Sequence, residues 1–359
     1  MARAARDAGF EVHVATRVDA GRAAIEAEGF QLHAIPFRRG LSPSSALETI
    51  VALRRLVSHL RPSVIHNAGL QACVLSAIAN LGRRQTQIHA MTGLGYIFTS
   101  GGARTRTMVS ELLRYLLNNK NCMVLVQNPD DQAALERLGV VPEKFVLIPG
   151  SGVDTAALTP MPEPDGFITV GFAGRLLSDK GIRALVEAHR RLRTQIDGIQ
   201  LIIAGRTDAA NPASIPDEEV ESWRSEPGIT LMGHISNIAD LWRISHIAAL
   251  PSHREGLPKS LLEAAACGRP MITTDAPGCR EIVLAGETGL LVPIEDPDAL
   301  VRAIGELAAS PELRARFGAA ARQLVEDKMS DTAIGAATVA LYRRITAAPQ
   351  VLQPCPEPQ

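Results

Sequence analysis

The chain has 359 residues, of which 46% are hydrophobic, 21% charged and 4% aromatic, and its formal net charge is −1. This composition is typical of a globular protein long enough for two domains, and the scarcity of aromatic side chains argues against a stacking platform for nucleic acid. The N-terminal half is modestly basic and the C-terminal half acidic. This asymmetry suits an acidic substrate or an anionic membrane surface but is too weak for DNA binding.

The cysteines and the apolar runs indicate in which cellular compartment the protein is expected. The 5 cysteines include no C-x-x-C pair, which indicates reduced thiols in the cytosol and no zinc site. No apolar run reaches the roughly 18 residues needed to span a bilayer, and the N-terminus lacks the apolar core of a signal peptide. We expect a cytoplasmic protein, with peripheral contact at the inner face of the plasma membrane as a further hypothesis.

The beginning of the chain is unusual for an α/β domain. MARAARDAG reads as a helix that ends at Gly9, and a strand follows over 12–16. An α/β domain usually opens with a strand, and none precedes this helix. We therefore expect the first strand of the domain to be missing, through a misplaced start or a real truncation.

Strand-like and helical patterns alternate along the rest of the chain. Strands are expected at 31–35, 64–66, 87–91, 123–127 and 145–148, and helices at 44–60, 70–81, 107–119 and 130–138. After the proline-rich segment TPMPEPDG a second series begins, with strands at 168–173, 200–204, 229–232, 247–250 and 290–293 and helices at 181–194, 237–245, 298–308 and 311–327. Such alternation predicts parallel sheets covered by helices on both faces.

The expected organisation is therefore two α/β domains with a cleft between them. The first domain covers 1–158, the linker 159–166, the second domain 167–330, a helix that could pack back on the first domain 331–347, and a disordered tail 348–359.

The stretch HREGLPKSLLEAAACGRPMITTDAPG, residues 253–278, carries the strongest chemical pattern. Its helix should begin near Pro258 and end at Gly268, with Glu255 in the loop before it and Glu263 on it. Helix N-termini attract anions, so amides of 256–259 could hold a diphosphate while Glu255 holds sugar hydroxyls and Glu263 a ribose diol. The alternative is a surface helix with two solvated acids.

A second loop carries two cations after a buried strand. In GFAGRLLSDKG, Gly174 and Arg175 follow the strand, and Lys180 precedes the glycine that opens a helix. The carboxyl ends of strands in open α/β sheets are where ligands bind, and both cations suit phosphate. A solvated basic turn is the alternative for this loop alone. Together with the Glu255 loop, an anion cradle is favoured.

These residues resemble a known family. GRLLSDKG, IIAGR, LMGH and the run from LPSHREGLPKSLLEAAACG to ETGLLVP are similar to the donor domain of retaining glycosyltransferases with the E-x7-E motif (family 4 type), over nearly all of 168–293. The resemblance implies the GT-B fold, which is two Rossmann-like domains facing a cleft. The bare spacing of two acids would be weak, but the whole run is specific.

The resemblance also implies roles for the matching residues. Arg175 and Lys180 would neutralise the leaving diphosphate, and Glu255 would act with them in catalysis. The donor would be bound by Gly174, Gly256, Leu257, Pro258 and Glu263. The resemblance implies retention of the anomeric configuration, without an accepted enzyme nucleophile, an obligatory metal or a further cofactor. The chain has no DxD pair beside the motif, which agrees with electrostatic handling of the leaving group.

The first domain resembles a narrower branch, whose members extend lipid-linked sugars for capsule, O-antigen and exopolysaccharide. HAMTGLGYIFTSG, VQNPDD and LIPGSGVD carry this likeness. Thr92 and Gly93 stand where many relatives have His-Gly, so no catalytic histidine can be transferred to position 92. His66, Asn67, Thr92 and Gly93 are candidates for the acceptor side of the cleft. A structural role for His66 and for His89 is the alternative.

The segment RTRTMVSELLRYLLNNK, residues 104–120, is basic and amphipathic. Met108, Leu112, Tyr115 and Leu116 should share one face. Docking on anionic lipid is one interpretation, and a core-facing helix with a solvated side is the other.

We therefore expect a retaining glycosyltransferase that moves a hexose or N-acetylhexosamine from a UDP-sugar to a glycan acceptor, lipid-linked through polyprenyl diphosphate. No nucleic-acid partner is expected. A UDP-sugar epimerase of the same fold is an alternative that needs no acceptor. An inactive, truncated nucleotide-binding remnant is another.

Overall fold

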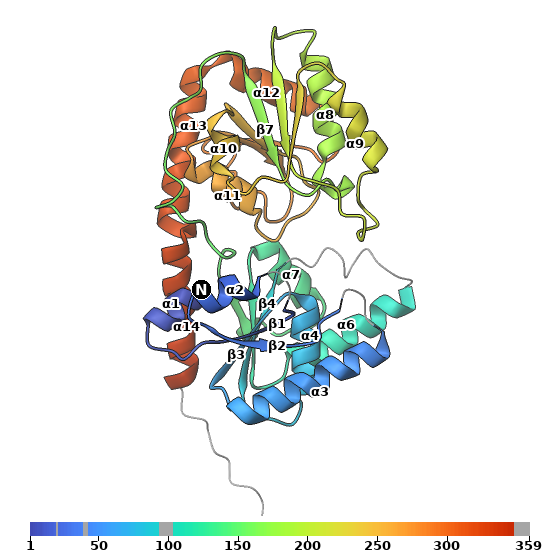
Figure 1. Ribbon diagram of the computed structural model, residues 1–359, viewed down its shortest axis with the longest axis vertical. Helices are drawn as coiled ribbons and strands as arrows, with labels where there is room; N and C mark the ends of the chain where they lie inside the picture. The colour runs from blue at the N-terminus through green and yellow to red at the C-terminus, as the bar shows by residue number, and fades with distance from the viewer. Residues whose placement is uncertain (19–20, 39–41, 93–102, 348–359) are drawn as a thin grey trace, which may run out of the picture.

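The computed structural model describes residues 1–18, 21–38, 42–92 and 103–347, without the side chains of 103–106. It consists of two lobes, one above the other in Figure 1. The elements of the N-terminal lobe are α1 (Ala2–Asp7), β1 (His13–Thr16), α2 (Arg22–Ala27), β2 (Gln31–Ala34), α3 (Pro43–Leu60), β3 (Val64–Ala68), α4 (Leu70–Ala79), β4 (Thr86–Met91), α6 (Ala103–Leu117), β5 (Cys122–Val126), α7 (Pro129–Arg137), η1 (Pro142–Lys144) and β6 (Phe145–Leu147).

The C-terminal lobe follows, together with the helices that lead out of it. Its elements are β7 (Thr169–Ala173), η2 (Ser178–Lys180), α8 (Ile182–Leu192), β8 (Gln200–Ala204), α9 (Asp217–Arg224), β9 (Ile229–Gly233), α10 (Ala239–Arg243), β10 (Ile247–Leu250), α11 (Lys259–Ala266), β11 (Met271–Thr274), β12 (Gly289–Val292), α12 (Pro297–Ala309), α13 (Pro311–Leu324), η3 (Val325–Met329, a π-helix) and α14 (Asp331–Ala347).

The sheets confirm the predicted α/β class, because every pair of strands is parallel. The C-terminal lobe holds a sheet of order β12-β11-β10-β7-β8-β9. The strands β7, β10 and β11 are buried along their whole length, as expected for strands with helices on both faces. The lobe has one continuous core around these strands.

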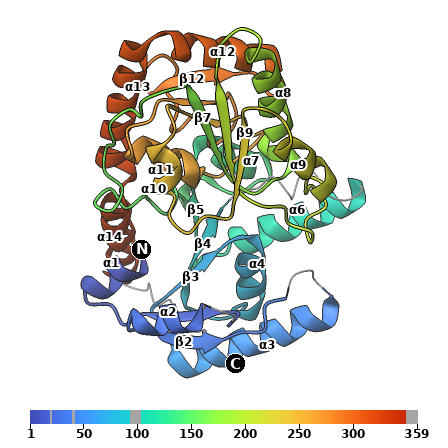
Figure 2. The same ribbon diagram turned by 45° about the horizontal axis from the view of Figure 1, so that its top comes forward.

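The N-terminal lobe contains two separate sheets among the described residues. One has the order β3-β4-β5-β6, and the other pairs β1 with β2. In Figure 2 β5, β4, β3 and β2 follow one another, so the smaller sheet lies beyond β3, the edge strand of the larger sheet. Helix α4 packs on β3 and β4 of the larger sheet, and α3 packs in turn on α4.

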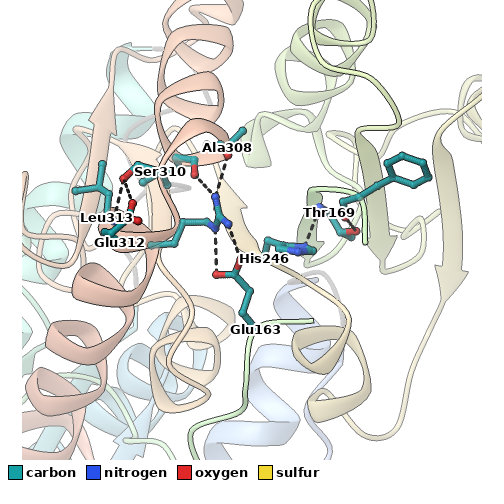
Figure 3. A network of polar contacts seen from close by, with 10 residues as sticks. Glu163, Thr169, His246, Ala308, Ser310, Glu312 and Leu313 are labelled. Atoms are coloured by element: carbon teal, nitrogen blue, oxygen red, sulfur yellow. Dashed lines mark hydrogen bonds and ion pairs between the residues drawn. The ribbon is translucent and has the colours of Figure 1, made fainter. Parts of the chain in front are cut away.

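The segment that joins the lobes, residues 155–163, is hydrogen-bonded to the C-terminal lobe by largely buried arginines. Arg322 donates to the carbonyls of Leu158 and Thr155, and Arg269 donates to the carbonyl of Pro162 at 2.8 Å. Figure 3 shows Glu163 of the linker beside the end of α12, where Arg314 joins the Glu163 carboxylate to the carbonyl of Ala308. Arg322 and Arg269 thus satisfy carbonyls of the irregular segment before β7, and Arg314 ties the Glu163 carboxylate to the end of α12.

The chain crosses between the lobes twice, and the two crossings are hydrogen-bonded. Val153 donates to the carbonyl of Met329 at 3.0 Å, and Asp331 donates to the carbonyl of Val153 at 2.9 Å. The second crossing leads into α14, which runs down one side of the N-terminal lobe against α1 (Figure 1). A Cβ at Gly335 would lie 2.7 Å from Ala4, so the two helices approach closely.

Within the described part of the chain, no helix combines the length and the apolar character that a membrane span requires. The expected disordered tail over 348–359 lies outside the described residues.

Candidate functional site

The loop after β7 begins with Gly174 and Arg175 at the carboxyl edge of the sheet. Gly174 donates to the carbonyl of Ala204 at 3.0 Å, and a Cβ at Gly205 would lie 1.8 Å from the carbonyl oxygen of Gly174. The loops after β7 and β8 are therefore packed backbone to backbone, which only glycine permits. Arg175 extends from this loop, is 59% exposed and pairs with Asp208 at 3.2 Å.

Lys180 ends the short helix η2, and Gly181 turns the chain into α8. Gly181 has φ +68°, and a Cβ there would lie 1.9 Å from the carbonyl oxygen of Pro251. The carbonyl of Asp179 accepts hydrogen bonds from the amide of His253 at 2.8 Å and from the hydroxyl of Ser252 at 3.1 Å. These contacts fix the Lys180 loop against the loop that follows β10.

Lys180 and Glu255 form a direct ion pair between these two loops. Their side chains are only 17% and 14% exposed, so the pair is largely removed from solvent. The strands that carry the loops, β7 and β10, are neighbours, while their successors β8 and β11 lie on opposite sides. This is the topological switch point of the sheet, where open α/β sheets bind ligands.

Helix α11 begins immediately after the Glu255 loop. Pro258 is its N-cap, one residue before the first helical position, and Gly268 lies just after the C-cap with φ +72°, where helices commonly end. Glu263 is 15% exposed and lies 3.5 Å from the ammonium of Lys259. Burial raises the pKa of Glu263, and the charge of Lys259 partly offsets that effect.

A cavity of about 640 Å³ lies beside these elements in the C-terminal lobe. Arg175, Ser260 and Glu263 line it together. Ser260 belongs to the first turn of α11, where backbone N–H groups lack partners within the helix. The cavity thus combines a guanidinium, a helix N-terminus and a largely buried carboxylate, which is a suitable set for a phosphate group next to a diol. Lys180 and Glu255 form the separate pair described above and are not among the cavity-lining residues.

Both halves of the chain match glycosyltransferase families. Residues 159–324 match the family described as "Glycosyl transferases group 1", and residues 1–150 match a "Glycosyl transferase 4-like domain". The chain is a group 1 glycosyltransferase. This identification confirms that it is an enzyme, and the switch point of the sheet lies within the residues that match the group 1 family.

Individual relatives agree with this family. The chain is 23% identical over 329 residues to the capsular polysaccharide biosynthesis glycosyltransferase CapM of Staphylococcus aureus. The aligned region covers 86% of this chain and 84% of CapM.

Solved structures confirm the GT-B fold. The sucrose-phosphate synthase of Thermosynechococcus elongatus has a TM-score of 0.82 at 23% identity and covers 97% of this chain and 92% of that one. The Anabaena protein HepE, solved with UDP and glucose, has a TM-score of 0.78 at 18% identity and covers 94% and 93%.

The described candidate residues of the N-terminal lobe lie on β3 and just after β4, which are neighbouring strands. His66 lies 2.6 Å from the hydroxyl of Tyr342 on α14, and burial lowers the pKa of His66 to about 4. Asn67 is buried and lies 3.3 Å from Nδ1 of His89. Thr92 is exposed at the end of β4. Gly93 lies outside the described residues, and a Cβ at Gly69, just after β3, would lie 3.7 Å from Oγ1 of Thr92, so Thr92 is next to the carboxyl end of β3.

Several residues around the cavity of the glycosyltransferase were not identified from the sequence. The loops after β8 and β9 contribute Arg206, Thr207, Asp208 and His234. The available signal was positional, because parallel strands bring their carboxyl ends to one edge of the sheet. Cys267 and Cys279 are buried free thiols. Burial raises the pKa of each to about 11, which suits a packing role.

Proposed function

We propose that this glycosyltransferase retains the anomeric configuration and transfers a hexose or N-acetylhexosamine from a UDP-sugar to a polyprenyl-diphosphate-linked glycan during synthesis of a bacterial surface polysaccharide. The observation that carries the proposal is the cavity lined jointly by Arg175, Ser260 and Glu263, next to the Lys180–Glu255 pair. The likeness to CapM, a capsular polysaccharide biosynthesis glycosyltransferase, and the UDP and glucose in the HepE structure support the substrate classes.

In this proposal the cavity holds the nucleotide, and the loops hold the reacting end of the donor. Glu263 accepts hydrogen bonds from the ribose hydroxyls, and Arg175 donates to the diphosphate. The loop residues Gly256 and Leu257 and the first turn of α11, which begins just after Pro258, contribute backbone N–H groups near the same charge. Lys180 carries the second cation, and Glu255 orients the sugar hydroxyls.

The proposed reaction breaks the bond between the anomeric carbon and a diphosphate oxygen, and the bonding electron pair leaves with UDP. The acceptor hydroxyl oxygen forms the new bond on the same face of the sugar, and its proton is released with UDP. The growing charge on the diphosphate is stabilised by the guanidinium of Arg175, the ammonium of Lys180 and the helix N-terminus. No metal ion is required in this scheme.

A donor screen tests the proposal. Thermal unfolding is measured with UDP, GDP and ADP and with a panel of UDP-sugars, because a ligand that binds only the folded state raises the unfolding temperature. We expect protection by UDP and by at least one UDP-sugar. Absence of protection by every nucleotide at millimolar concentration would refute the donor site.

The preferred UDP-sugar is then incubated with the enzyme, with and without lipid-linked acceptors. Release of UDP that depends on acceptor supports the transferase, and NMR of the product reports whether the anomeric configuration is kept. Epimerised nucleotide-sugar without UDP release would instead indicate a UDP-sugar epimerase. Binding with neither product would indicate an inactive nucleotide-binding protein.

We further propose that α6 docks on an anionic bilayer that presents the lipid-linked acceptor. Met108, Leu112 and Tyr115 are 74%, 41% and 68% exposed, and their spacing puts them on one side of the helix. Leu116, which we expected on the same face, is instead buried at 2%. The exposed stripe lies in the more basic half of the chain, and apolar contact plus positive charge is what interfacial helices use.

Cosedimentation with vesicles tests this surface. The wild type should bind phosphatidylglycerol vesicles more than phosphatidylcholine vesicles, and the variant M108S/Y115S should bind less than the wild type. L47S is the matched control, since Leu47 on α3 is also 62% exposed. Equal binding by M108S/Y115S and the wild type would refute the α6 surface.

A further inference from the structure

The beginning of α7, in the N-terminal lobe, contacts the loop that presents Glu255 in the other lobe. Asp131 of α7 forms an ion pair with Arg254, and the Asp131 side chain is fully buried. Asn128 donates from Nδ2 to the carbonyl oxygen of Gly256 at 2.7 Å. Since Glu255 stands between Arg254 and Gly256, both of its neighbours in the chain are tied to the opposite lobe.

Asn128 also holds the helix that supplies these contacts. Its Oδ1 accepts from the amide of Asp131 at 2.8 Å, which is the usual N-cap hydrogen bond of an α-helix. Its Nδ2 lies 3.1 Å from Oδ2 of Asp131. One amide therefore satisfies the helix N-terminus, orients the Asp131 carboxylate and binds the Gly256 carbonyl.

The same loop is held from its other side by the C-terminal lobe. The amide of Glu255 donates to the carbonyl of Pro277 at 3.0 Å, and a Cβ at Gly278 would lie 2.5 Å from the carbonyl oxygens of Glu255 and Gly256. The backbone of Glu255 is thus confined between the turn at Gly278 and the N-terminus of α7. Losing the contacts of α7 would free one side of it.

We infer that Asn128 and Asp131 are positioning residues for the donor sugar, which they act on through Glu255. This inference rests on the proposed function, in which Glu255 orients the sugar hydroxyls. The described residues that line the proposed nucleotide cavity all belong to the C-terminal lobe, so these two residues should affect recognition of the sugar and not of UDP. If the ion pair served only to join the lobes, its loss would not weaken binding of the sugar while leaving binding of UDP unchanged.

Two variants isolate the contacts. N128S keeps an N-cap, because serine caps helices about as well as asparagine, but its side chain is too short to retain the bond to Gly256. D131N removes the charge that faces Arg254 and keeps the shape of the side chain. D130N is the matched control, because Asp130 is the preceding residue and its contact with Arg280, at 3.5 Å, is between side chains that are 40% and 39% exposed.

Dissociation constants for UDP and for the UDP-sugar that binds best in the panel are measured by calorimetry for each variant, followed by kcat and KM. For N128S and D131N we expect the ratio of the two constants to shift about tenfold against the sugar, the usual size of losing one buried hydrogen bond to a charged or fixed group. UDP affinity should stay within about twofold of wild type, and D130N should behave as wild type. The retained affinity for UDP also shows that each variant is folded.

The double variant D131N/R254Q tests the route of the effect. If Asp131 acts through Arg254, the double variant should bind the UDP-sugar no more weakly than D131N, because residues in contact are not additive. An unchanged ratio in N128S and D131N, or equal losses for UDP and UDP-sugar, would overturn the inference. A wild type that binds UDP but no UDP-sugar would refute the proposed function itself, and it is recognised without any variant.

Discussion

The substitution K180A tests the electrostatic centre of the site most directly. Lys180 and Glu255 are in contact, and their side chains are 17% and 14% exposed. Removing the ammonium leaves the Glu255 carboxylate without its cation in a largely dry position. In the proposed reaction it also removes one of the two cations that face the departing diphosphate.

The size of the effect follows from this burial. A hydrogen bond to a charged group contributes about 1.5–3 kcal/mol, and solvent screening is weak for a pair this far from water. At about 1.4 kcal/mol per factor of ten, kcat/KM should fall roughly 10- to 150-fold. Because the charge on the diphosphate grows as the bond breaks, much of the loss should appear in kcat.

The assay is the initial rate of UDP release with the preferred donor and acceptor, over a range of donor concentrations. K328A is the control, because Lys328 is an exposed lysine on η3 and surface substitutions usually change stability by no more than about 0.5 kcal/mol. Turnover by K180A at the wild-type rate would refute the assignment of Lys180, and an equal loss in K328A would show that the assay reports stability.

Three further outcomes follow from the geometry. E263Q should weaken UDP binding about tenfold. Because burial raises the pKa of Glu263, wild-type UDP affinity measured by calorimetry should fall on acidification above the usual carboxylate range, whereas E263Q should show no such step. G181A should lower the free energy of unfolding in urea by more than the ~1–2 kcal/mol of left-handed backbone strain, since its Cβ would also meet a carbonyl oxygen. G286A, with φ +76° and open space around it, should lower the free energy of unfolding by the strain alone. The folded-state pKa of His66 is about 4 against an ordinary 6.5, so the unfolded chain binds a proton that the folded chain does not. Stability should therefore fall as the pH drops from 6.5 towards 4, and H66Q should flatten that slope; an unchanged slope would contradict the burial of His66.

The parts of the fold that follow from local chemistry were predictable. Strands that are buried on both faces have continuous apolar sequences. All residues of β7 and β10 are buried, so both strands could be recognised from their apolar runs. The loops after these strands had to meet at one sheet edge, which is why Arg175 and Glu263 were expected in one site before the structure placed both along the same cavity.

Two helices were missed because their apolar patterns are sparse. Helix α9 has the sequence DEEVESWR, with Val220 and Trp223 as its apolar residues, and helix α2 consists mainly of alanine and charged residues. The stretch 311–327, expected as one helix, is α13 followed by the π-helix η3. Sequence periodicity does not register a change of helix type within one continuous apolar stripe.

Contacts between residues far apart in sequence were beyond prediction. His66 was expected near the cleft because it lies near a strand end, but alternation along a strand does not reveal which element covers each face. Its partner Tyr342 is 276 residues away. The same holds for Asp131, which lies in the helix expected at 130–138 and whose sequence context gave no sign of Arg254.

The two segments that cross between the lobes are paired at Val153 and Ser330, so they act as one connection. The segment after Val153 is hydrogen-bonded to the C-terminal lobe through Arg322, and α14 packs against α1 of the N-terminal lobe. Any rotation of one lobe relative to the other must therefore bend both crossing segments together. Such a rotation would leave the cavity of the C-terminal lobe unchanged, since every described residue that lines it belongs to that lobe, but it would move α7 away from the loop at Glu255. In the proposed reaction, a nucleotide-sugar would therefore find the cavity already formed, whereas the loop at Glu255 would be held from both sides only after the lobes close.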